Sequence, residues 1–246
     1  MTGSGLYEDP NLARFYDLPG QARANFDYVE ARVASGQRVL DLGCGTGALA
    51  ARLARKCDVV ATDSAEAMLS IARTREGADS VTWLRGDART LRLRSQFDWV
   101  VMTGHTFQVF LSGADQVSVL RTVRAHLAPG GRFLFDTRNP ACPDRKERGR
   151  DETFERVHDP RLGEVERWNV SSYDDGSGIL TYTNGYRVLE TGTVHEASEK
   201  IRYTSQADLA ARISAAGLRV TGWLGEWDGT GFAPQSREII PVGEPA

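Results

Sequence analysis

The sequence contains few cysteines, and their spacing suits neither a disulfide framework nor a metal site. Cys44, Cys57 and Cys142 are the only 3 cysteines in 246 residues, and no two of them form a Cys-x-x-Cys pair. An odd number of widely spaced cysteines is atypical of small disulfide-bonded domains and of structural zinc sites. We therefore expect reduced thiols, no bound metal and a cytoplasmic location.

Long apolar runs, an excess of basic residues and internal repeats are also missing. No run approaches the ~20 apolar residues of a membrane-spanning helix. The N-terminal segment MTGSGLYEDPNL lacks the apolar core of a signal peptide. The formal net charge of −3 gives no general basic field that would attract nucleic acid or an anionic membrane. We therefore expect neither nucleic acid nor a membrane as a partner.

Strand-like and helical segments alternate through the first half of the chain. Short runs rich in β-branched, aromatic and leucine residues predict strands at 38–42, 58–62, 81–84, 97–102 and 132–136. Helical spacing of apolar residues predicts helices at 21–34, 47–56, 64–75 and 113–127, the third with Ser64 as its N-cap. This alternation is typical of a parallel sheet with helices on both faces.

The pattern changes after Asp136. Residues 138–150 are polar and rich in breakers, which predicts a loop. Residues 153–203 alternate strand-like runs with turn sequences such as DDGSG, which predicts an antiparallel meander. The meander is too short for a core of its own, so we expect an insertion that packs over the parallel sheet.

The C-terminal part returns to a helix followed by two strands. Residues 205–216 are expected to be helical, with Ser205 and Asp208 as a capping box. Strands are predicted at 218–223 and 238–242. The connection between them is too short for a crossover helix, so this pair should be antiparallel.

A glycine-rich loop lies between the first predicted strand and the helix that follows it. In RVLDLGCGTGALAARLA, the residues Gly43, Gly45 and Gly47 allow a tight turn and the close approach of a ligand. Ligands of open α/β sheets bind at such carboxyl ends of strands. With Ala48 the same loop also satisfies the G-x-G-x-x-A pattern of dinucleotide sites. Two classes of cofactor are therefore open at this point.

Three acids lie close to this loop in the predicted fold. Asp63 ends the second strand, where a carboxylate can bind two ribose hydroxyls. Asp87 ends the third strand and suits a polar contact with an adenine. Asp41 lies inside the first strand, and a carboxylate at that depth needs loop N–H groups or a cationic ligand as partners.

Four segments in register carry a family resemblance. VLDLGCGTG, VVATDSAEAML, LRGDARTL and FDWVVM follow one another over residues 38–136 and resemble the class I S-adenosylmethionine-dependent methyltransferases. The resemblance implies S-adenosylmethionine as cofactor, with S-adenosylhomocysteine as its product. It also implies an α/β fold with a Rossmann-like, seven-stranded, mostly parallel sheet, helices on both faces and an antiparallel β insertion after strand 5.

The resemblance further implies which residues bind the cofactor. The glycine loop would contact the methionine portion, Asp63 the ribose, and Asp87 the adenine amine beside Ala88. Met102 would line the cofactor and the methyl-transfer site. The full predicted set comprises Asp41, Gly43, Cys44, Gly45, Gly47, Asp63, Ser64, Met68, Asp87, Ala88 and Met102, with Tyr16 and Arg23 from an N-terminal lid.

Members of this family often close the site with a lid that carries a tyrosine and a basic residue. Tyr16 and Arg23 are the candidates, and the guanidinium of Arg23 could pair with the cofactor carboxylate. A core tyrosine and a surface arginine remain the alternative. The expected layout is one domain over 1–246, with lid helices at 1–36, the cofactor-binding core at 37–137, the insertion at 138–204 and the final helix and strand pair at 205–246.

A histidine follows the fourth strand. Positioning supplies most of the catalysis in an in-line methyl transfer, and a base assists where the acceptor must lose a proton. Among the 4 histidines, His105 is the best placed, in MTGHTFQVF, although it could also serve only to order the loop. His126 lies late in a helix and is expected to be structural.

The insertion is rich in aromatic residues. They could roof an acceptor pocket and favour a cationic or ring-bearing acceptor, or they could simply belong to a half-buried antiparallel sheet. The sequence leaves both interpretations open for Trp168, Tyr173, Tyr182, Tyr186 and Tyr203.

The sequence after the fourth strand bears on the acceptor. Amino-directed nucleic-acid methyltransferases carry an Asn-Pro-Pro-Tyr box there, where this chain has Met102-Thr103-Gly104-His105. We therefore predict a methyltransferase that acts on a nitrogen or an oxygen of a small molecule, as a monomer or a dimer. An NAD(P)-dependent oxidoreductase and a non-catalytic S-adenosylmethionine-binding module are the alternatives.

Overall fold

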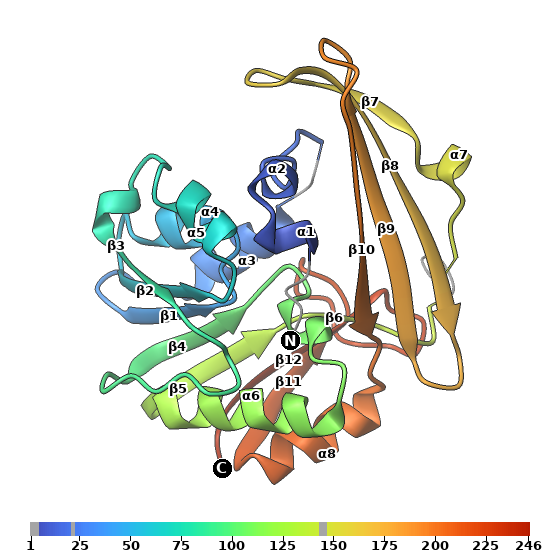
Figure 1. Cartoon of the computed structure of the whole chain (residues 1–246). Helices are drawn as coiled ribbons and strands as arrows, with labels where there is room; N and C mark the ends of the chain where they lie inside the picture. The colour runs from blue at the N-terminus through green and yellow to red at the C-terminus, as the bar shows by residue number, and fades with distance from the viewer. Residues whose placement is uncertain (1–4, 21–22, 143–146) are drawn as a thin grey trace.

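The computed structural model describes residues 5–20, 23–142 and 147–246. A mixed sheet flanked by helices and a separate antiparallel sheet organise these residues (Figure 1). The N-terminal helices α1 (Gly5–Glu8) and α2 (Pro10–Ala13) lie between the two sheets (Figure 1). No helix in the described ranges is long and apolar enough to cross a membrane.

The mixed sheet has the strand order β11-β12-β5-β4-β1-β2-β3. Its parallel strands confirm the alternation predicted from the sequence, and they are β1 (Arg38–Leu42), β2 (Asp58–Asp63), β3 (Val81–Arg85), β4 (Phe97–Met102) and β5 (Leu127–Phe135). The antiparallel C-terminal pair is also confirmed, as β11 (Leu218–Leu224) and β12 (Glu238–Pro245). A two-residue strand, β6 (Thr137–Arg138), pairs with β12 as well.

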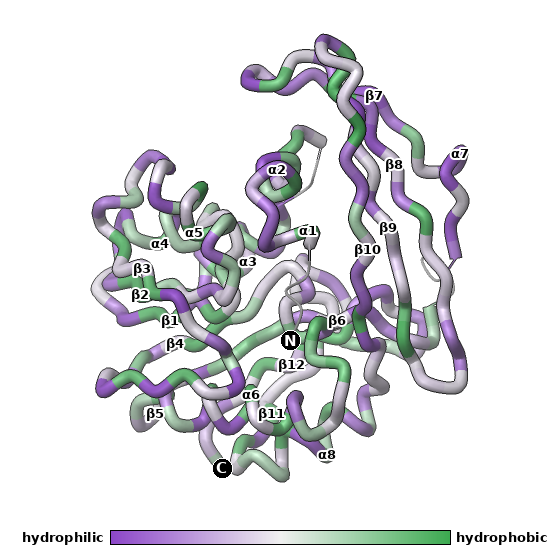
Figure 2. The backbone as a smooth tube through the Cα atoms, viewed as in Figure 1, coloured by the Kyte–Doolittle hydropathy of each residue, from purple (hydrophilic) through white to green (hydrophobic). Residues whose placement is uncertain are grey.

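Helices cover both faces of the mixed sheet. One face packs on α6 (Gly113–His126) and α8 (Gln206–Ala215), and the other on α3 (Ala24–Arg32) and α4 (Ala48–Leu53). Strand β1 shows the alternation, because Leu40 and Leu42 join the first apolar cluster and Val39 joins the second. The hydrophobic colouring of β4 and β5 in Figure 2 reflects this burial on two sides.

One helix start differs from the sequence prediction. Helix α5 (Glu66–Ala72) begins after Ala65, and no side chain caps it. The predicted N-cap, Ser64, is exposed. Asp63 instead accepts the backbone N–H of Ala65 at 2.9 Å. The prediction of Ser64 as N-cap was wrong because the preceding aspartate forms the local turn with its own side chain.

Short helical turns elsewhere are η1 (Ala78–Ser80), η2 (Thr106–Val109) and α7 (Arg150–Thr153).

The antiparallel sheet has the order β10-β9-β8-β7. The predicted meander corresponds to β8 (Gly163–Asp174), β9 (Ile179–Val188) and β10 (Val194–Arg202), and β7 (Glu155–Asp159) adds a fourth strand. The N-terminal segment packs against this sheet. The ring of Phe15 stacks on Tyr186 with the centroids 4.5 Å apart, and the hydroxyls of Tyr7 and Tyr182 lie 2.8 Å apart.

The aromatic residues of this sheet do not share one face. Trp168 stands directly opposite Gly185 across β8 and β9, one residue out of phase with Tyr186. Because neighbouring side chains of a strand point to opposite faces, Trp168 lies on the face away from the N-terminal helices. Arg150 stacks on it there, 4.1 Å from the ring centroid. Trp168 therefore does not join Tyr182 and Tyr186 as part of a roof over the core.

Replacement of Gly47 would test how tightly the loop between β1 and α4 is packed. Its φ is +76°, and a Cβ atom there would lie 2.4 Å from the Trp83 ring and 2.8 Å from the Ala72 methyl. We expect Gly47→Ala to lower the free energy of unfolding by about 1–3 kcal/mol more than Gly36→Ala, because overpacking adds to left-handed strain. Gly36 is the matched control, with a φ of +80° and nothing within 4 Å. Equal losses in urea unfolding would contradict this packing.

Candidate active site

The glycine loop joins β1 to α4 and is tied to the end of β2. Gly43, Gly45 and Gly47 all have left-handed backbone angles, with φ of 81°, 55° and 76°. The N–H groups of Gly43 and Cys44 both donate to the carbonyl of Thr62, at 2.7 and 2.9 Å. Only glycine adopts three such angles in five residues without strain. The loop therefore has one fixed shape at the carboxyl edge of the sheet.

Asp63, at the end of β2, is bonded to this loop. One of its carboxylate oxygens accepts the N–H of Gly45 at 2.8 Å, and the other accepts the N–H of Ala65 at 2.9 Å. Burial raises the pKa of Asp63, and these backbone N–H groups oppose that shift. Each oxygen keeps a free lone pair, so Asp63 can also accept hydrogen bonds from ligand hydroxyls.

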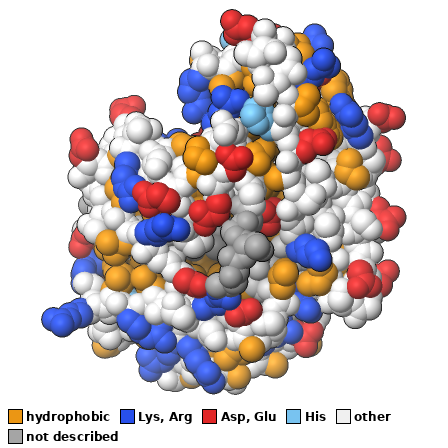
Figure 3. All heavy atoms as spheres, viewed as in Figure 1, with side chains coloured by type: hydrophobic (Ala, Val, Ile, Leu, Met, Phe, Trp, Pro, Cys, Tyr) orange, Lys and Arg blue, Asp and Glu red, His pale blue; other side chains and the backbone are white. Residues whose placement is uncertain are grey.

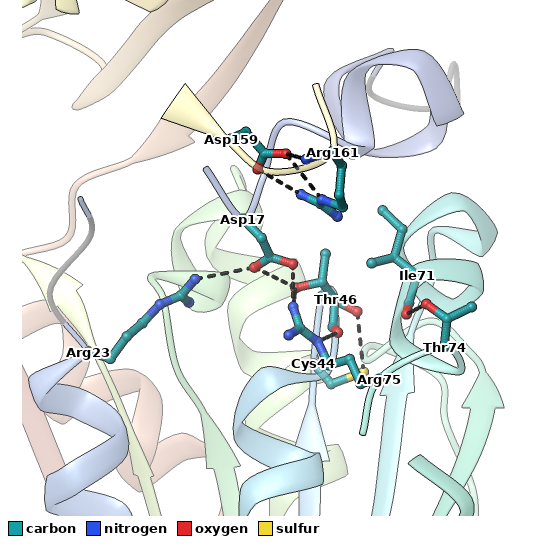
Figure 4. A network of polar contacts seen from close by, with 10 residues as sticks. Asp17, Arg23, Cys44, Thr46, Ile71, Thr74, Arg75, Asp159 and Arg161 are labelled. Carbon is teal, nitrogen blue, oxygen red and sulfur yellow. Dashed lines mark hydrogen bonds and ion pairs between the residues drawn. The ribbon is translucent and has the colours of Figure 1, made fainter. Parts of the chain in front are cut away.

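A network of ion pairs joins the N-terminal segment to the glycine loop (Figure 4). Asp17 accepts hydrogen bonds from Arg23 at 3.2 Å and from the Thr46 hydroxyl at 3.1 Å. Arg75, which follows α5, ion-pairs with Asp17 and donates to the Thr46 carbonyl. Arg161, from the antiparallel sheet, points toward the same group in Figure 4 and pairs with Asp159 at 3.2 Å.

These ion pairs bear on the predicted roles of Arg23 and Tyr16 in the N-terminal lid. Arg23 was expected to bind a cofactor carboxylate, but in the structure its recorded ion pair is with Asp17. The Tyr16 ring lies against the glycine loop, 3.7 Å from the position of a Cβ atom on Gly45. The sequence analysis missed Asp17 and Arg75. Their separation of 58 residues gives no local signal, and tertiary packing alone brings them together.

The loop after β4 carries His105 in an unusual conformation. His105 has a φ of 65°, and among the described residues it is the only one besides glycine with a positive φ. Such a conformation persists only where its surroundings impose it, and it is enriched at functional sites. Here the N–H of His105 donates to Asp136 at 2.9 Å. Asp136 directly follows β5 and is 1% exposed.

The Nε2 edge of the His105 imidazole faces two carboxylates. Its Nε2 is 2.9 Å from Glu238 Oε2 on β12 and 3.7 Å from Asp136 Oδ2. Burial raises the pKa of Asp136, and the His105 charge opposes that shift. The sequence analysis did not find Asp136 or Glu238 as partners, because they join His105 only through the sheet order. No metal was expected, although ligand atoms of these three residues lie within 4.8 Å of one another.

Comparisons with known proteins agree with this geometry. Residues 39–131 match the family model described as a methyltransferase domain. The cypemycin N-terminal methyltransferase of Streptomyces sp is 32% identical over 220 residues, which cover 86% of this chain and 84% of that protein. The chain belongs to the class I S-adenosylmethionine-dependent methyltransferases. This assignment supports methyl transfer and not an NAD(P)-dependent oxidoreductase or a non-catalytic binding module.

Solved structures of methyltransferases share the complete architecture. The CcbJ methyltransferase from Streptomyces caelestis has a TM-score of 0.82 and 25% identity, with 98% of both chains covered. The sugar N-methyltransferase KedS8 from Streptoalloteichus sp has a TM-score of 0.73 at 19% identity, with 97% of this chain and 93% of that chain covered, and shows the same fold. A malonyl-[acyl-carrier protein] O-methyltransferase of Bacillus cereus is 33% identical over 165 residues, which cover 64% of this methyltransferase and 55% of that protein. The chain thus spans about half of that relative's length.

The first acid of the site fits the positive charge of S-adenosylmethionine. Asp41 is 1% exposed, and no hydrogen bond or ion pair reaches its side chain from the described residues. Burial, with a smaller contribution from the charge of Asp63, raises its pKa to about 7. Of the two kinds of partner expected for Asp41, loop N–H groups or a cationic ligand, the first is not found among the described residues. A buried carboxylate without a counter-charge suits a cationic ligand, and the sulfonium cofactor carries that charge.

Asp87, at the predicted adenine end of the site, already has a cationic partner in the protein. Arg89 donates to both oxygens of Asp87, at 3.0 and 3.1 Å from Nε, and it also bonds Asp115 of α6 at 3.2 Å. The Arg89 guanidinium holds the pKa of Asp87 below its usual value. Ala88 is buried beside it. Asp87 thus already has a cationic partner, and its remaining lone pairs are available to a ligand.

The other predicted cofactor contacts differ in their surroundings. Met68 and Met102 are buried and belong to apolar clusters. Cys44 is half-buried, and burial raises the pKa of its thiol, which keeps the sulfur protonated. Ser64 is exposed, and its carbonyl accepts a hydrogen bond from Arg85 at 3.0 Å. Acidic and basic side chains intermingle on the surface near this region (Figure 3).

Asp63 tests the cofactor site directly. Asp63→Ala removes the carboxylate that is bonded to the loop, so we expect at least a tenfold loss of S-adenosylhomocysteine affinity by calorimetry. Asp58→Ala is the control, since Asp58 is exposed at the opposite end of β2 and pairs with Arg38 at 3.1 Å. Wild-type affinity in the Asp63 variant would rule out the ribose assignment.

Asp41 links binding to pH-dependent stability. Its folded pKa of about 7 exceeds the ordinary value of 3.8, so the folded state binds this proton first and gains stability as the pH falls through 7. Asp41→Asn removes the charge. We expect the variant to be about 2–4 kcal/mol more stable than wild type at pH 8.5, with the difference vanishing near pH 4.

The measurement is urea unfolding across this pH range, with calorimetry on the same samples. The Asp41→Asn variant should bind S-adenosylhomocysteine, which lacks the sulfonium charge, nearly as well as wild type does. Its affinity for S-adenosylmethionine should fall. A stability difference that does not change with pH would contradict the unpaired buried charge.

Proposed function

We propose that this methyltransferase transfers the methyl group of S-adenosylmethionine to an amine nitrogen of a small molecule, with His105 as the base. The observation that carries the proposal is the imidazole whose Nε2 faces Glu238 and Asp136 at the carboxyl edge of the sheet. Two carboxylates around one imidazole favour the approach of a protonated amine. The imidazole can then accept the amine proton.

The hydrogen bonds of His105 define how the proton would move. Glu238 accepts from the Nε2–H of His105 at 2.9 Å, which leaves the lone pair on Nδ1. Nδ1 takes the proton from the acceptor, and Glu238 stabilises the resulting imidazolium. Asp136 holds the backbone N–H of His105 and so fixes the ring in place. When bound, S-adenosylmethionine supplies an electrophilic methyl group on a sulfonium, and alignment supplies the rest.

The names of relatives support nitrogen as the acceptor atom. The cypemycin relative is an N-terminal methyltransferase, and KedS8 is a sugar N-methyltransferase. The Bacillus cereus O-methyltransferase matches over a smaller part of this chain, 64% against 86%. Loss of a proton from a hydroxyl could use the same base, so oxygen methylation is the outcome that the experiment must separate.

We also propose the placement of the cofactor along the carboxyl edge. The methionine portion lies on the loop of Gly43, Cys44, Gly45 and Gly47, and Asp63 binds the ribose. Tyr16 covers this loop from the N-terminal segment, with a ring 3.7 Å from the Cβ position of Gly45. Arg23 reaches the site through its pair with Asp17. Ser64, Met68, Asp87, Ala88 and Met102 surround the adenosine and the transferred methyl.

His105→Gln tests the role of the base. We expect kcat for an amine acceptor to fall by about 100-fold at pH 7. The loss should shrink toward the pKa of the amine, where the acceptor is already neutral. His158→Gln is the matched control, because His158 also pairs with a glutamate, Glu164 at 2.8 Å, but is exposed on β7.

The assay follows methyl transfer to paired amines and phenols over a range of pH, with product mass spectra. Methylation of phenols alone would replace nitrogen by oxygen in the proposal. An unchanged kcat in His105→Gln at every pH would remove the base. Loss of wild-type activity in EDTA would assign the three side chains to a metal ion.

A further inference from the structure

A second charged group, Arg138, lies next to the His105 cluster. Arg138 ends β6, two residues after Asp136, and is half-buried. No carboxylate of the described residues forms an ion pair with its guanidinium. The arginines near the cofactor loop differ, since Arg23 and Arg75 share Asp17, and Arg89 pairs with Asp87. A half-buried guanidinium without a direct ion pair can accept an anion that a ligand supplies.

Gln108 holds Arg138 in place with a neutral group. The Oε1 atom of Gln108 accepts from Arg138 Nη1 at 3.0 Å and from its backbone N–H at 3.3 Å. The Nε2 atom of Gln108 donates to the carbonyl of Arg202 at 3.1 Å, which fixes the orientation of the amide. Gln108 is fully buried. The other N–H groups of the guanidinium have no recorded partner within the described ranges, and they can bind two oxygens of one anion.

Arg138 lies close to the proposed catalytic base, His105. Arg138 and Glu238 line the same small cavity, and Glu238 is the partner of His105. The Arg138 charge also lowers the pKa values of Asp136 and Tyr182, in opposition to burial. Arg138 therefore borders the His105 cluster through Glu238, and its partner Gln108 contacts the end of β10 at Arg202.

The face of the antiparallel sheet that carries Tyr182 and contacts the N-terminal helices has a further polar group. Ser171 stands directly opposite Tyr182 across β8 and β9, so the two side chains share a face. Ser171 is 8% exposed, and its hydroxyl has no hydrogen-bond partner in the described part of the chain. A buried hydroxyl without a partner is a position where a ligand oxygen can bind.

We propose that Arg138 binds an oxyanion of the acceptor, a carboxylate or a phosphate. The acceptor is then a small amine with an acidic group on the same molecule. The acid docks on Arg138 while the amine meets His105. The nature of the methylated atom rests on the proposed function, whereas the anion preference concerns Arg138 alone.

Matched probes separate these two claims. The pairs are benzylamine with 4-(aminomethyl)benzoate, ethanolamine with phosphoethanolamine, and phenol with 4-hydroxybenzoate. Each is titrated by calorimetry into the protein saturated with S-adenosylhomocysteine, and each is assayed for methylation with S-adenosylmethionine. The variants are Arg138→Gln, Arg138→Lys and Arg121→Gln. Arg121 is exposed on α6, so its variant controls for loss of one positive charge.

We expect the acidic member of at least one pair to bind wild type at least tenfold more tightly than its neutral partner. Arg138→Gln should lose this preference while it still binds S-adenosylhomocysteine, and Arg138→Lys should keep part of it. Arg121→Gln should keep all of it. The carboxylate and phosphate pairs identify which oxyanion is preferred.

Three results would overturn the proposal: no preference for the acidic members, no binding of any acidic probe, or an unchanged preference in Arg138→Gln. Methylation of the phenol pair alone would overturn the amine acceptor instead. In that case a preference for 4-hydroxybenzoate over phenol, lost in Arg138→Gln, would still support the oxyanion site. The two failures are therefore distinguishable.

Discussion

The left-handed backbone of the glycine loop is the constraint on which the rest of the site depends. Three positive φ angles turn the chain from β1 into α4 within a few residues. The N–H groups of Gly43 and Cys44 donate to the carbonyl of Thr62, and the N–H of Gly45 donates to the carboxylate of Asp63. The ends of β1 and β2 are thereby joined, and Asp63 is held at the position that a ribose would need. A side chain on Gly43 would meet Thr106 of η2, and one on Gly47 would meet Trp83 of β3 and Ala72 of α5.

The remaining sides of the site come from segments far from this loop in sequence. The N-terminal segment reaches the loop through Asp17, Thr46 and Arg75, and it reaches the antiparallel sheet through Phe15 and Tyr186. These contacts tie the lid to both sheets. The N-terminal segment and the antiparallel sheet are therefore packed on each other, although 175 residues separate Tyr7 from Tyr182 along the chain.

Charge is divided between the two ends of the site. Acids gather at two places, Asp41 and Asp63 at the glycine loop, and Asp136 and Glu238 beside His105. Arg138, which forms no ion pair with a carboxylate of the described residues, lies opposite Glu238 across β6 and β12. An electrostatic arrangement of this kind orients a ligand that carries a positive nitrogen and a negative group.

The sequence by itself determined the core of this protein. The hydrophobic periodicity, the glycine loop and the acids at the strand ends are local patterns, and they sufficed for the parallel sheet, the cofactor class and the placement of Asp63. The sequence-based prediction of Ser64 as the N-cap was wrong, because the side chain of Asp63 accepts the backbone N–H of Ala65 at the start of the helix. It also could not show that Trp168 faces away from the lid, because the face depends on strand register.

Only the tertiary structure decided the partners of the charged side chains. His105 meets Glu238 because β12 inserts between β5 and β11, which no local pattern encodes. Asp17 meets Arg75 because the lid packs on α5. Gln108 meets Arg138 because β6 returns toward η2. Ion pairs between segments that are distant in sequence depend on how the sheets and helices pack on one another. The hydrophobic periodicity of the sequence shows only which face of each helix or strand is buried.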